Sequence, residues 1–225
     1  MPKPRALACK GVAGWVASGV ISAVSAFGAF GSLHASAQAM GQEICGSLVN
    51  GYGPYDYRRE REGLLKIVED RHFTAEVELL RRGVSGSLGG DLDYTLRASP
   101  NHHRALMAAS ALSIREQNPR PHHMRWTIEC YFDRARRFQP DDVMVPMLLA
   151  NHLIQSKKDK EASQALARAA ELAAGNPLTH YNIGLLYLEA KDLDGALAHA
   201  RKARDLGHPR TELLERLKTL GKAAD

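Results

Sequence analysis

The chain has 225 residues, of which 44% are hydrophobic and 24% are charged, with a formal net charge of +5 at pH 7. Three of the basic residues, Lys3, Arg5 and Lys10, stand at the start without acidic neighbours, so the rest of the chain is closer to neutral. Nucleic-acid binding needs a clustered basic face, and we expect no nucleic-acid partner. The length is sufficient for one domain with its own core.

Residues 1–39 have the layout of a secretory signal peptide. A basic start is followed by an uncharged, apolar stretch of small residues at 11–33, and two A-x-A sites follow within residues 35–39. We therefore expect cleavage of a leader and export of the remainder to the periplasm or out of the cell. The alternative is a retained membrane anchor, because about 20 apolar residues span a bilayer. Any membrane contact would then be made through the leader alone.

Removal of the leader leaves two of the three cysteines, Cys45 and Cys130. An even pair in an exported chain predicts a disulfide. This bond would fasten the N-terminal segment to the helices that follow it. The alternative is two unpaired buried thiols.

Residues 40–97 are predicted to be an irregular segment with short helices. The tyrosine-rich stretch at 51–57, punctuated by glycine and proline, is either a tether across the helices or a loop that contacts a partner. Residues 74–82 favour a short helix with capping residues at both ends. Residues 84–91 are rich in glycine and serine and predict a mobile loop, and residues 93–97 alternate weakly, which predicts an extended segment.

Residues 98–142 predict a pair of helices. Ser99 followed by Pro100 is a good helix start, so a first helix should run from there to about residue 115. Prolines within 118–121 should end it, and a second helix is predicted from about residue 122 to residue 138.

Residues 143–176 and 177–210 align without a gap, at a period of 34 residues. Each line holds two apolar-periodic segments joined by a short polar turn. Small residues occupy the same places in both lines. They are Ala150 over Gly184 and Ala162 over Ala196. A unit of this size cannot bury its apolar face alone, so the period indicates stacked helix–turn–helix units.

This aligned segment resembles the tetratricopeptide repeat (TPR) family. The resemblance implies an all-α, TPR-like stack of helical hairpins and suggests partner binding, and it names no reaction. Pro146 and His180 stand where the family pattern has a bulky aromatic residue. Ala174 and His208 replace the closing proline of that pattern.

The flanking segments extend the stack to about three repeats and a cap. Residues 98–142 resemble an irregular first repeat with an insertion in its turn, because Phe132, Ala135 and Phe138 precede Leu166, Ala169 and Leu172 by one period. Residues 211–225 are predicted to hold a terminal capping helix, which keeps an open array soluble.

Stacked hairpins curve, and the resemblance implies that their first helices line a concave surface. The residues predicted to form this partner-binding groove are Arg104, Met147, Asn151, Ile154, Tyr181, Leu185 and Leu188. A bare apolar groove favours association, so we expect a partner peptide, a second copy or residues 41–97 to cover it. The sequence therefore predicts a non-catalytic interaction scaffold of the bacterial cell envelope or exterior.

The alternative function is metal or small-ligand binding by a histidine-rich hairpin. Its candidate ligands are His102, His103, His122 and His123. Neutral imidazole is the commonest metal ligand, but no H-E-x-x-H or C-x-x-C pattern accompanies these pairs. Otherwise, the histidines would cap helix starts and hydrogen-bond to the upstream segment.

Catalysis has less support in the sequence. There is no G-x-S-x-G motif and no Walker loop. Glu69 and Glu76 near His72 are the candidates for an acid–base site, but charged residues on a helix surface are more often solvated. We expect no enzyme activity and no cofactor.

Overall fold

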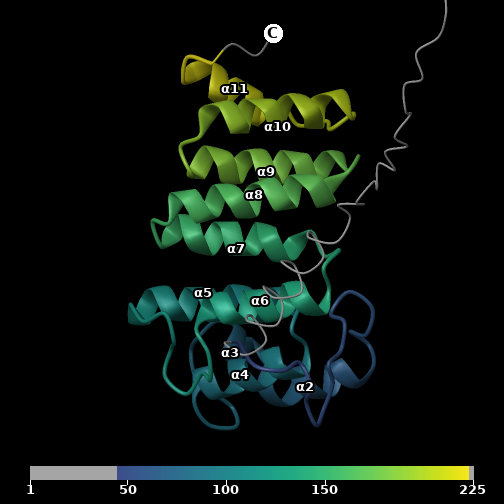
Figure 1. Cartoon of the computed structure of the whole chain (residues 1–225), viewed down its shortest axis with the longest axis vertical. Helices are drawn as coiled ribbons and strands as arrows, with labels where there is room; N and C mark the ends of the chain where they lie inside the picture. Colours follow the sequence, from purple (N-terminus) through teal and green to yellow (C-terminus); the bar gives the residue numbers. More distant parts are fainter. Residues whose placement is uncertain (1–44, 223–225) are drawn as a thin grey trace, which may run out of the picture. The chain divides into compact units, whose positions relative to one another are not determined.

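The structure is a computed structural model that describes residues 45–222, and in this range it is helical without any strand (Figure 1). The predicted all-α fold class is confirmed for these residues. The predicted leader at 1–39 lies outside them. Among the described residues, no helix combines the length and apolar character needed to cross a membrane.

The helices fall into an N-terminal group, three successive hairpins and a terminal helix. The N-terminal group is α2 (Leu64–His72), α3 (Ala75–Glu78) and α4 (Leu88–Ala98). The hairpins are α5 (His103–Glu116) with α6 (Ile128–Phe138), α7 (Met144–Gln155) with α8 (Asp159–Ala173), and α9 (Pro177–Glu189) with α10 (Leu193–Asp205). The terminal helix is α11 (Glu212–Thr219), and Figure 1 shows α7 to α11 following one another in chain order.

Helix α4 begins at Leu88, so the loop predicted at 84–91 is wrong from residue 88 onward, and the extended segment predicted at 93–97 is wrong throughout. The Ser87 hydroxyl caps the helix by accepting a backbone N–H of the first turn. Leu92 and Leu96, four residues apart, are fully buried on one face. A Cβ at Gly89 would lie 2.0 Å from the carbonyl oxygen of His122. Glycine here therefore permits a close approach between segments rather than a loop.

Three other predicted boundaries shift for local reasons. Helix α3 ends earlier than residue 82, because Leu80 adopts a left-handed φ of 54°. Helix α5 begins at His103 rather than Ser99, which caps the C-terminus of α4 instead. Helix α6 begins at Ile128, where the Thr127 hydroxyl accepts a backbone N–H.

The two hairpins formed by residues 144–205 share a turn conformation and have small residues at matching positions. Their turns place Lys157 and Lys191, one period apart, at left-handed φ values of 58° and 62°. Ala150 and Ala162 are fully buried between α7 and α8. Gly184 holds the place of Ala150, and a Cβ there would lie 2.8 Å from Leu213 of α11. The small residues at matching positions thus set the spacing between helices.

Candidate functional site

His102 serves the fold rather than a metal. It is the N-cap of α5, where its Nδ1 accepts the N–H of Ala105 at 3.1 Å. Because Nδ1 accepts, the proton is on Nε2, which lies 2.9 Å from Glu69 Oε1 on α2. The ring is fully buried beside Tyr57 and Phe73. This confirms, for His102, the alternative in which histidines cap helix starts and bind the upstream segment.

The other three histidines of the predicted metal hairpin have separate partners. His103 Nε2 lies 2.8 Å from Asp142 Oδ2, and His123 Nδ1 lies 2.7 Å from the Ser87 hydroxyl. His122 is exposed, with its backbone N–H donating to Glu116. Within residues 45–222, no cluster of three or more His, Cys, Asp or Glu side chains is placed to hold a metal ion.

Asn101 is the centre of a buried polar network that joins three segments of the chain. Its Nδ2 donates to Asp56 Oδ1 at 2.7 Å and to Asp142 Oδ2 at 2.9 Å, and its Oδ1 accepts the N–H of Tyr57 at 3.1 Å. Arg58 donates to Asp56 and reaches Gln139 and Asp141 before α7. The tyrosine-rich segment is therefore a tether, as one of the two predicted alternatives states.

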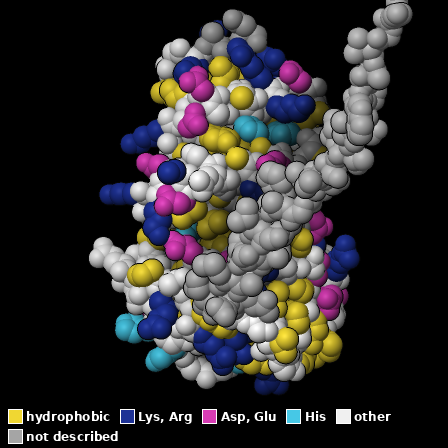
Figure 2. Space-filling view, in the orientation of Figure 1, with side chains coloured by type: hydrophobic (Ala, Val, Ile, Leu, Met, Phe, Trp, Pro, Cys, Tyr) yellow, Lys and Arg dark blue, Asp and Glu magenta, His cyan; other side chains and the backbone are white. Residues whose placement is uncertain are grey.

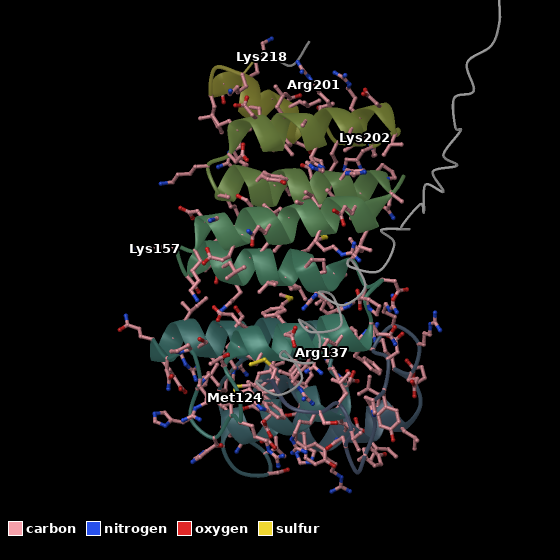
Figure 3. All side chains as sticks on the ribbon, in the orientation of Figure 1. Met124, Arg137, Lys157, Arg201, Lys202 and Lys218 are labelled. Atoms are coloured by element: carbon pink, nitrogen blue, oxygen red, sulfur yellow. A yellow bond between two sulfur atoms is a disulfide. The ribbon has the colours of Figure 1, made fainter. Side chains whose placement is uncertain are left out.

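The predicted disulfide between Cys45 and Cys130 is present and fixes the start of the described chain to α6. Arg134, which is almost fully buried, donates from one guanidinium nitrogen to the carbonyls of Cys45 and Ser47. Its guanidinium lies 4.1 Å from the Trp126 ring, and burial lowers its pKa to about 10. Arg137, labelled in Figure 3, donates to the neighbouring carbonyl of Gly46. Together these contacts attach residues 45–47 to α6.

The predicted partner-binding residues do not form one open groove. Met147 and Tyr181 are only 5% and 6% exposed, so their assignment as partner contacts is corrected to core packing. Arg104 is engaged with Glu78 and lies over the Phe73 ring. Asn151 accepts a hydrogen bond from the side chain of Gln155. The remaining three predicted residues are half-buried, and they are Ile154, Leu185 and Leu188.

The structure instead has a groove of about 540 Å³ between α6 and α8, over the face of α7. Its floor is apolar. The floor residues are Phe132, Val145, Pro146, Leu149, Leu153, Ala165 and Leu172. None of the seven predicted partner-binding residues lines it. The lining of α8 extends from Glu161 to Leu172, about 16 Å at 1.5 Å per residue. That length accommodates several residues of an extended or helical peptide.

The rim of this groove is charged with both signs. Its members include Glu129, Asp133, Arg136, Lys158, Glu161 and Arg168. Lys158 pairs with Glu129 at one end, and Arg168 donates to the carbonyl of Pro140 at the other. At the level of α7, the visible face carries apolar side chains bordered by charges of both signs (Figure 2). Lys157, labelled in Figure 3, marks the turn from α7 to α8.

The 34-residue register explains why space is left at this groove. Pro146 and Ala165 line it, and the residues one period later are His180 and His199. Those two imidazoles contact each other between α9 and α10. Between α7 and α8 the smaller side chains of Pro146 and Ala165 therefore leave a space open. In the next hairpin, the two imidazole rings fill the equivalent space.

A smaller depression of about 210 Å³ lies beside α4. His72 Nδ1 is 2.9 Å from Asp91 Oδ1, and the ring stacks on Tyr94. The other Asp91 oxygen accepts two backbone N–H groups of residues 84 and 85. Glu69 and Glu76, the predicted acid–base partners of His72, contact His102 and two arginines instead. The His72–Asp91 pair therefore holds the glycine- and serine-rich segment in place through hydrogen bonds to its backbone.

Burial favours the neutral form of three histidines. It lowers the pKa of His102, His152 and His199, in the last case with help from the neighbouring His180. The hydrogen bond from His102 lowers the pKa of Glu69. Burial opposes ionisation of Asp56, but hydrogen bonds from Arg58 and Asn101 lower its pKa to about 2.

These pKa directions predict that the protein loses stability in mild acid. Below about pH 6.5 the unfolded chain binds protons at His102, His152 and His199 that the folded chain does not, so the free energy of unfolding falls as pH falls. A second loss, from about pH 4 downward, follows protonation of Asp56. Urea midpoints between pH 7.5 and 4.5 test the first window. His152→Gln should flatten that dependence and His122→Gln should not. A midpoint that is constant down to pH 5 would contradict it.

Comparison with known proteins adds no identification: no family model, no curated protein and no solved structure matches this chain.

The groove residues were missed because the resemblance to the repeat family implies a binding surface on the first helix of each hairpin. A signal for them exists in the two aligned lines. In the alignment, Pro146 corresponds to His180 and Ala165 corresponds to His199. Smaller side chains at two positions that meet in space indicate a local cavity.

Proposed function

We propose that this chain is an exported, non-catalytic protein–protein interaction scaffold of the TPR type. It acts in the bacterial cell envelope or outside the cell and holds an apolar segment of a partner protein, or of a copy of itself, in the groove between α6 and α8. The observation that carries the proposal is the open apolar floor of that groove inside a rim of mixed charge.

The chemistry of the groove suits a peptide better than a small polar ligand. Apolar side chains of a bound segment would cover the half-buried Leu149 and Leu172, which removes their remaining exposed apolar surface from water. Charges at the edges of the segment would face Arg136 and Glu161, which fixes direction and register. The 34-residue period and the leader predicted at residues 1–39 support the same class of protein.

Filling the groove should weaken partner binding. Ala165 lies in the groove, whereas Ala167 is exposed on the same helix and does not line it. A partner is first captured by crosslinking to the purified chain and then purified, and its affinity is measured by calorimetry. We expect Ala165→Trp to weaken binding at least about tenfold, equivalent to about 1.4 kcal/mol, and Ala167→Trp to leave it unchanged.

Asn151→Trp tests the surface predicted from the sequence. If this variant loses the partner and Ala165→Trp retains it, the groove between α6 and α8 is not the binding site. If all three variants bind equally, neither surface is used and the scaffold proposal fails. If the partner is a second copy of the chain, sedimentation velocity over a range of concentrations compares the self-association of the same three variants.

A further inference from the structure

Two histidines on different helices meet in the last hairpin. His180 of α9 and His199 of α10 place their Nδ1 atoms 3.1 Å apart, with ring centroids separated by 5.2 Å. Figure 2 shows histidine side chains at the surface over α9 and α10. Neither imidazole contributes to the groove between α6 and α8.

The surrounding contacts orient both rings. His180 Nε2 lies 2.9 Å from the carbonyl oxygen of Ala174, which only accepts, so Nε2 carries the hydrogen and Nδ1 the lone pair. A ring N–H held by a backbone carbonyl is the usual support of a metal-binding histidine. His199 is stacked on Tyr187 at 5.3 Å with an interplanar angle of 19°, which fixes its plane.

The spacing and exposure suit an ion at the surface. With metal–nitrogen bonds of about 2.0–2.1 Å, two nitrogens of a tetrahedral site are about 3.3 Å apart, so the observed pair needs only a small adjustment. His180 is 5% exposed and His199 is half-buried. One side of the pair is therefore anchored in the fold and the other is open to water.

We propose that His180 and His199 bind a divalent transition-metal ion through their Nδ1 atoms, with water completing the coordination. Imidazole ligands favour Cu²⁺ over Ni²⁺ and Zn²⁺. In the free protein the Nδ1–H of His199 donates to His180. On binding, that proton moves to Nε2 of His199, so both rings remain neutral and no proton is released. With two protein ligands the ion is exchangeable.

Titration of the purified chain with Cu²⁺, Ni²⁺ and Zn²⁺ salts by calorimetry tests the site. We expect one binding event that His199→Gln weakens at least about tenfold, and affinities that are highest for Cu²⁺. His122→Gln, which alters an exposed histidine of another hairpin, should leave the event unchanged.

Electron paramagnetic resonance of the Cu²⁺-loaded chain should report two nitrogen ligands, and one fewer in His199→Gln. This readout keeps the test valid if the variant is less stable, since a folded fraction is sufficient. Equal affinity and an identical spectrum in His199→Gln would overturn the proposal, as would loss of the event in His122→Gln.

Discussion

Replacing Asn101 with leucine is expected to lower the free energy of unfolding by about 3–5 kcal/mol. The substitution removes two donors from the buried carboxylates of Asp56 and Asp142 and leaves the N–H of Tyr57 without its acceptor. Asp56 and Asp142 are only 4% and 2% exposed, so water cannot replace the lost hydrogen bonds. Urea unfolding followed by circular dichroism measures the change.

Asp141→Asn is the matched control, because Asp141 also binds Arg58 but its side chain is 65% exposed. We expect a loss below about 1 kcal/mol for this exposed ion pair. If the two substitutions cost the same, the network around Asn101 does not hold the tether to the hairpins.

Removing the disulfide should have a similarly large effect. Cys45 and Cys130 are 85 residues apart, and for a loop of that length the chain-entropy model gives about 4–5 kcal/mol at 25 °C. We expect the Cys45→Ser, Cys130→Ser double variant to lose this amount in denaturant unfolding, with unchanged helix content before the transition. The bond acts on the unfolded chain, and the hydrogen bonds of Arg134 still hold residues 45–47 in the folded one.

Treatment of the parent protein with a reducing thiol is the internal check and should reproduce the midpoint of the double variant. A parent midpoint that does not move under reduction, with the thiols shown to be free, would contradict the expected role of the bond.

The helices of residues 144–219 were predictable because each contains its own signal. Buried alanines at 162 and 196 recur at the repeat period, and Leu213 and Leu217 share the buried face of α11. Helix α4 was not predictable from local preference. Glycine is required at position 89 because the carbonyl of His122 approaches closely, and that contact exists only in the folded chain.

The candidate sites also divide into those that could be predicted from the sequence and those that depend on packing. Cys45 and Cys130 were predicted, since cysteine number and compartment are properties of the sequence. The pairing of His180 with His199 was not, because their meeting depends on how α9 and α10 pack. The groove was missed although its cause, the loss of bulk at Pro146 and Ala165, is visible in the aligned lines.

The disulfide and the hydrogen bonds that join the most distant residues of the chain are unevenly distributed along it. The disulfide, the Arg58–Asp141 bond and the Asn101–Asp56 bond join residues 85, 83 and 45 positions apart, and all lie before α7. Helices α7 to α11 contact mainly their neighbours in the chain. Under tension applied to its two ends, the molecule would therefore give way from the C-terminal side. Helix α11 would detach first and the hairpins would then unzip in turn, while the tethered half resisted longest.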